Sequence, residues 1–124
     1  MATTVDVALK NLMGLDGALA AALVDYTSGL TLGGTSASKM LDISVAAAGN
    51  TEVVKAKMRT MEMLGLDDLI EDILITLGQQ YHLLRPLHGR DGTGLFLYLA
   101  MDKARGNLAL ARHRLQKVGE DLEV

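Results

Sequence analysis

Cysteine and tryptophan are absent from this 124-residue chain, and proline occurs only once. Without cysteine, the protein has neither a disulfide framework nor a thiolate metal site. The N-terminus lacks a basic segment followed by an apolar run, so we expect no secretory signal. The longest apolar run, residues 94–101, is far shorter than the roughly 20 residues of a membrane-spanning helix. These absences favour a cytoplasmic protein that does not insert into a membrane.

A large excess of either charge is also missing. The formal net charge is −3, whereas nucleic-acid binding relies on basic patches that displace counterions. Hydrophobic residues make up 49% and charged residues 22% of the chain, which is typical of a folded globular domain rather than a disordered one. We therefore expect a single domain over residues 1–124 and no nucleic-acid partner.

Three segments have the apolar spacing of helices. The first covers residues 4–13, and the second runs from about Asp42 to Met63, with Asp42 or Ser38 as its cap and Gly65 as its stop. The third begins after Asn107, a predicted N-cap. Its apolar stripe has spacings of three and four and comprises Leu108, Ala111, Leu115, Val118 and Leu122.

The remaining segments read as strands. Residues 17–25 alternate, and the small face Ala18, Ala20 and Ala22 would let a helix approach closely. A short return strand, residues 30–32, completes a hairpin, and residues 33–38 form a polar loop after it. The further predicted strands are residues 69–77, 81–87 and 95–101, with Pro86 marking the end of its strand. Because the last strand is apolar on both faces, we place it centrally in one antiparallel α/β sheet covered by helices on both sides.

One loop superficially suggests phosphate binding. Residues 33–39 read Gly-Gly-Thr-Ser-Ala-Ser-Lys, but a phosphate loop needs glycine before the lysine and serine or threonine after it. Here Ser38 precedes Lys39 and Met40 follows it. We interpret the segment as a connection between a strand and a helix.

Other chemistry also lacks its usual spacing. His82 and His88 match no metal-binding motif, so we interpret them as surface or loop residues. The acidic pairs 67–68 and 71–72 flank or interrupt an apolar strand, where charge more often guards an exposed edge than catalyses. No nucleophile elbow surrounds Ser28 or Ser44. We therefore predict that the protein is not an enzyme and uses no metal or cofactor.

Two side-chain groups have ordinary structural interpretations. Met58 and Met61 fall on the apolar stripe of the second helix and are expected in the core, with Met63 at the helix end, although methionine surfaces also suit adaptable partners. The basic residues 112–114 and Lys117 are interpreted as a solvated helix face.

Several segments together resemble the Roadblock family, also called the dynein light-chain 7 family. Residues 106–115 resemble its closing helix, residues 17–30 its opening hairpin, and residues 83–87 and 94–99 its last two strands. The resemblance covers nearly the whole chain. It implies a five-stranded antiparallel sheet of order 2-1-5-4-3, with the middle helix on one face and the terminal helices on the other.

The resemblance also implies a homodimer, formed by pairing third strands into one continuous sheet with the two middle helices side by side. On this chain the third strand is residues 69–77. The implied interface residues are Ala46, Ala47, Asn50, Val54, Leu69, Glu71, Ile73 and Ile75. Such pairing would also account for an apolar edge strand, which alone would promote aggregation.

Prokaryotic members of this family accompany small Ras-like GTPases, and animal members serve as dynein light chains or as scaffolds. The resemblance therefore implies a dimeric regulator or adaptor of a small GTPase. The candidate partner-binding residues, on the second helix, are Glu52, Lys55, Arg59 and Glu62. No residue is assigned as an arginine finger, although Arg59 is the best candidate.

Two alternatives remain open. One is a structural scaffold, or a subunit like a dynein light chain, that leaves hydrolysis unchanged. The other is a small-molecule sensor, which would need a pocket lined with polar groups.

Overall fold

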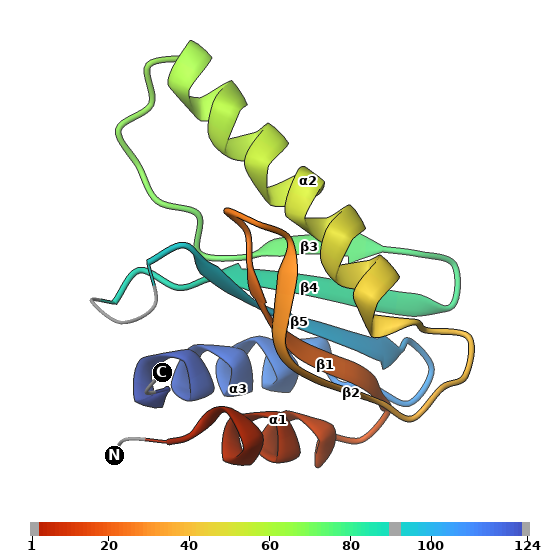
Figure 1. Cartoon of the computed structure of the whole chain (residues 1–124). Coiled ribbons are helices and arrows are strands. Elements are labelled where there is room, and N and C mark those ends of the chain that lie inside the picture. Colours follow the sequence, from red (N-terminus) through yellow and green to blue (C-terminus); the bar gives the residue numbers. More distant parts are fainter. Residues whose placement is uncertain (1–2, 90–92, 123–124) are drawn as a thin grey trace.

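A computed structural model describes residues 3–89 and 93–122 of the chain. They form a five-stranded antiparallel sheet of order β2-β1-β5-β4-β3, as the sequence predicts (Figure 1). The elements in chain order are α1 (Val5–Met13), β1 (Ala18–Asp25), β2 (Leu30–Ser36), α2 (Ile43–Met63), β3 (Ile73–Thr76), β4 (Gln80–Pro86), β5 (Leu95–Asp102) and α3 (Leu108–Asp121). Helix α2 covers one face of the sheet, and α1 and α3 cover the other. No helix in these two described ranges is long and apolar enough to span a membrane.

Strand β5 occupies the middle of the sheet, where its sequence places it. It is buried at every position except Asp102 and lies between β1 and β4. Alternate β5 side chains enter two separate cores. Leu97 and Leu99 pack with α1 and α3, whereas Phe96 and Tyr98 pack beneath α2.

The core beneath α2 depends on small side chains in β1. Ala20 and Ala22 lie fully buried there with Ala47 and Val54 of α2, so the helix packs close to the sheet as expected. The alternation does not extend to Ala18, because a bulge between Ala18 and Ala20 shifts the register against β5. Consequently Ala18 packs on the α1–α3 side and Leu19 on the α2 side.

Strand β2 is longer than predicted. Residues 33–36, expected in a loop, continue the strand to Ser36. Glycine serves close packing here rather than a turn: a Cβ on Gly33 would come within 2.8 Å of Val5, and one on Gly34 within 2.7 Å of Ile43. Both helices thus approach β2 through positions without side chains.

Strand β3 is shorter than predicted, because residues 66–72 are irregular. Side chains take the hydrogen bonds that a neighbouring strand would otherwise supply. The Leu69 amide donates to the carboxylate of Asp68 (2.8 Å), and the Ile70 carbonyl lies 2.7 Å from Nε2 of His88. Strand pairing therefore begins only at Ile73.

The predicted helix boundaries are confirmed by their caps. Thr4, Asp42 and Asn107 each accept a hydrogen bond from a backbone amide in the first turn of α1, α2 and α3 respectively. At the end of α2, Gly65 has φ +70°, the amide of Gly65 donates to Glu62, and that of Leu66 donates to Met61. This left-handed glycine arrangement stops the helix. Pro86 ends β4, also as expected.

Candidate interaction surface

The C-terminal end of α2 overhangs the sheet (Figure 1). Val54 is the last fully buried residue of the helix, and after it Met58 and Met61 are only partly buried. The chain then returns toward β3 through the irregular segment 66–72. About three helical turns therefore lie where few of the protomer's own side chains can cover them.

Large apolar side chains are exposed around this overhang. Met63 is 75% exposed, Leu64 65%, Leu66 53% and Leu69 65%. Leu66 and Leu69 line the same two hollows with Met61, so these residues form a patch rather than scattered single side chains. A contiguous apolar patch of this kind marks an interaction surface.

Strand β3 forms one edge of the sheet beside this patch. It is hydrogen-bonded to β4 on one side, and no strand within residues 3–89 and 93–122 pairs with its other side. Ile73 and Ile75 are partly buried toward α2, and Leu74 is exposed toward the opposite face. An apolar edge of this kind is a template for another strand.

The exposed part of α2 has two chemically different flanks. One flank faces β3: Ala46 and Asn50 line a hollow with His82 of β4, and Lys57 lines another with Ile73. Small and apolar side chains dominate this flank, which we call the β3-facing flank. It comprises Ala46, Gly49, Asn50, Val53, Lys57 and Thr60.

The other flank is charged. Glu52, Lys55, Arg59 and Glu62 are all exposed, and their spacing of three, four and three residues places them on one side of the helix. Glu62 also lines a hollow with Tyr26, on the side of the sheet away from β3. We call these four residues the charged flank.

Two of the predicted interface residues lie elsewhere. Ala47 is 1% exposed and Val54 is fully buried, and both pack against the protomer's own sheet. Their side chains are therefore unavailable to a second copy. Leu69 and Glu71 lie in the irregular segment before β3 rather than within a strand.

His82 and Tyr98 form a polar pair beneath the first half of α2. The His82 Nε2 lies 2.8 Å from Oε1 of Gln80, so this nitrogen carries the proton. Nδ1 then accepts from the Tyr98 hydroxyl at 3.4 Å. Burial lowers the pKa of His82 and raises that of Tyr98 to about 12. The interpretation of His82 as a surface or loop residue was wrong, because the residue lies within β4.

Two basic residues of α3 contact neighbouring elements, whereas His113 and Lys117 are exposed as predicted. Arg112 donates two hydrogen bonds to the Asp72 carboxylate, at 2.8 and 3.2 Å, and this raises the pKa of Arg112. Arg114 donates to the side-chain oxygen of Asn11 in α1 (2.9 Å). The Arg112–Asp72 pair fixes the start of β3 to α3, 40 residues further along the chain. Sequence spacing alone did not reveal this long-range contact.

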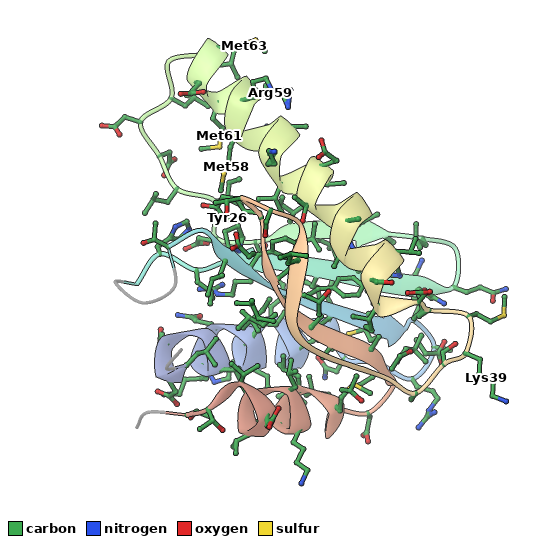
Figure 2. The ribbon with its side chains drawn as sticks, viewed as in Figure 1. Tyr26, Lys39, Met58, Arg59, Met61 and Met63 are labelled. Atoms are coloured by element: carbon green, nitrogen blue, oxygen red, sulfur yellow. The ribbon has the colours of Figure 1, made fainter. Side chains whose placement is uncertain are left out.

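The phosphate-loop alternative finds no support in the geometry. Gly33 and Gly34 lie in β2, and Lys39 projects from the connection before α2, far from the overhang (Figure 2). Ser28 accepts from the Leu30 amide and Ser44 donates to Asp42, so both hydroxyls have structural hydrogen bonds. Within the described part of the chain, no group of three or more His, Cys, Asp or Glu side chains could hold a metal ion.

No family model and no curated protein sequence matches the chain. Several solved structures, however, are similar to this chain. MglB from Myxococcus xanthus superposes with a TM-score of 0.81 at 16% identity, covering 94% of this chain and 83% of that one. A Roadblock/LC7 domain from Streptomyces avermitilis gives 0.77 at 13% identity, covering 95% and 93%. A structure of MglB with a tetrameric arrangement gives 0.79 at 17% identity, covering 94% and 82%.

Proposed function

We propose that this chain, which has the Roadblock/LC7 fold, is a dimeric adaptor or regulator that binds a small Ras-like GTPase. The observation that carries the proposal is the β3 edge lying open beside the uncovered β3-facing flank of α2. These two features give one continuous surface for a second copy of the chain. The charged flank of α2 then remains for a different protein.

The dimer proposal rests on the chemistry of that surface. Pairing β3 with its copy would satisfy the edge backbone groups and extend the sheet across both protomers. Ala46, Gly49 and Val53 carry short side chains, which would let the two α2 helices approach closely. Burial of the exposed apolar groups would stabilise the pair by about 25 cal/mol for each Å² removed from water.

The proposed interface modifies the set expected from sequence. We retain Ala46, Asn50, Ile73 and Ile75, together with Leu69 and Glu71 immediately before β3. Ala47 and Val54 are replaced by Gly49 and Val53, because only the latter two are accessible. A similar structure, of MglB, has a tetrameric arrangement, and this supports the proposal that a chain with this fold can associate with copies of itself.

The GTPase proposal rests on the charged flank and on the family that the sequence resembles. Lys55 and Arg59 lie on the same side as Glu52 and Glu62, which offers both signs of charge to a polar protein surface. Arg59 is exposed and its guanidinium reaches outward from α2. It can contact a partner's bound nucleotide without any nucleotide site in this chain.

Co-elution with the Ras-like GTPases of the source organism, each loaded with GDP or a GTP analogue, tests this proposal. We expect a complex in at least one nucleotide state. The Lys55→Glu/Arg59→Glu variant should bind at least tenfold more weakly, because two attractive contacts become repulsive. Lys10→Glu/Lys117→Glu is the matched control and should bind normally. No complex in either state, or equal losses in both variants, contradicts the proposal.

A scaffold that tethers a partner without changing hydrolysis would use the same surface. The exposed apolar patch around Met63 and Leu64 suits such a role equally well. Unchanged GTPase rates within a stable complex would favour this alternative.

A further inference from the structure

A groove lies under the overhang of α2, on the side of the molecule away from β3. Its volume is about 440 Å³. Met58 and Met61 form its roof, and Tyr26 and Leu87 contribute to its floor at the end of the sheet. Figure 2 shows Met58 and Met61 directed from α2 toward Tyr26. Leu66 and Leu69 form part of a side wall.

The lining of this groove is apolar and adaptable. Two methionines face an aromatic ring, and unbranched thioether chains repack readily around different apolar shapes. Leu66 and Leu69 remain more than half exposed, so the groove is incompletely filled by the chain itself. An apolar side chain inserted into the groove would cover the two methionines, Leu66 and Leu69.

The rim of the groove is acidic. Glu62 and Asp68 line it, and the part of the lining that the structure describes contains no lysine or arginine. His88 also lines the groove, and its Nε2 lies 2.7 Å from the Ile70 carbonyl. The two carboxylates therefore favour a cationic group over an anionic one at this rim.

Part of the groove lies outside the surface proposed for dimerisation, although Leu69 belongs to both. A second hollow, lined by Lys57 and by Ile73 of β3, shares Leu66 and Leu69 with the groove. The groove instead opens beside Tyr26 and Leu87. The part lined by Tyr26, Met58 and Leu87 therefore stays accessible when β3 pairs with a second copy.

We propose that this groove binds a basic amphipathic helix of a partner protein. One apolar side chain of that helix inserts between Met58, Met61 and Tyr26. Lysine or arginine residues one turn away lie against Glu62 and Asp68. This mode combines an apolar anchor with complementary charge and follows the general pattern of a helix in a groove.

Three synthetic peptides test the proposal on the full-length protein. The first is an amphipathic helix with leucines at i, i+3, i+4 and i+7 and lysines elsewhere; the second replaces every lysine with glutamate. The third keeps the composition of the first but scrambles its order. Binding is measured by fluorescence anisotropy, and its location by NMR of ¹³C-methyl methionine. We expect the first peptide to bind at least tenfold more tightly than the other two. It should also be the only one that shifts the methyl signals of Met58 and Met61.

The signals of Met13, Met40 and Met101 serve as internal controls and should not move. Glu62→Lys/Asp68→Lys should reverse the preference toward the glutamate peptide, because two exposed carboxylates become cations. Asp68 also accepts a hydrogen bond from the Leu69 amide, so unchanged Met13 and Met101 signals are needed to show that this variant keeps its fold. Asp16→Lys/Glu120→Lys makes the same change in net charge away from the groove and should not reverse it. No binding, binding independent of peptide charge or order, or shifts confined to other methionines would overturn the proposal.

Discussion

At the scale of single residues, burial depends on what covers an apolar stripe. The spacing of Ala47 and Val54 marks the inner side of α2 correctly, but the covering surface is the protomer's own sheet and not a second copy. A helical stripe specifies that a face is covered without specifying by what. Ala18 illustrates a second limit, since a bulge between Ala18 and Ala20 reverses its direction and alternation alone does not indicate the bulge.

His82 gives a residue-scale prediction about pH. Its pKa is lowered in the folded protein by burial, so the unfolded chain binds a proton more readily. The resulting stability is fully present above the unfolded pKa of about 6.5 and decreases as the pH falls below it. We expect the free energy of unfolding, measured by urea titration, to fall between pH 7.5 and 5.5.

The control for this prediction is His82→Gln, which cannot titrate. Glutamine can still accept from the Tyr98 hydroxyl, which has no partner other than His82 among the hydrogen bonds that the structure describes. The variant should show a smaller change in stability over the same pH interval. An equal change in both proteins would mean that His82 contributes nothing to the pH dependence.

At the scale of elements, helices were easier to predict than the edge strands. The three helices have clear caps and stripes, so their boundaries are confirmed within one or two residues. Strand β2 was shortened in the prediction because Gly33 and Gly34 normally suggest a turn. Strand β3 was extended because Leu69 and Ile70 are apolar, although side-chain hydrogen bonds divert this segment from the sheet.

The two flanks of α2 give an element-scale prediction about assembly. Val53→Arg introduces a long charged side chain on the β3-facing flank and should convert the proposed dimer to a monomer. Val53 is 37% exposed, so the protomer should still fold. The mass measured by light scattering after size exclusion should fall from two chains to one.

Glu52→Arg is the matched control, because it places the same side chain one position away on the charged flank. This variant should remain dimeric. A second disruption, Ile73→Asp, acts through β3 and should also give the monomer. A dimeric mass for both Val53→Arg and Ile73→Asp would exclude the proposed interface.

At the scale of the whole molecule, the sheet order was the most predictable property. A strand that is apolar on both faces belongs in the centre, and stripes on three helices require two covered faces. The resemblance to the Roadblock family supplied the order of the strands, and solved structures at 13–17% identity share this fold.

The partner surface was less predictable than the sheet order, because exposed residues such as Lys55 and Arg59 are not constrained by packing. The groove beneath α2 was missed, because its lining combines separate segments that no local spacing connects.

The most direct test of the central claim is the rate of GTP hydrolysis and of nucleotide release by the GTPase that co-elutes with this protein. Both rates are measured with and without the protein, under single-turnover conditions. We predict that the protein changes at least one of these two rates. Val53→Arg should abolish this change because it removes the dimer, whereas Glu52→Arg should leave the dimer intact. If neither rate changes for any Ras-like GTPase of the source organism, the protein is not a regulator of such an enzyme.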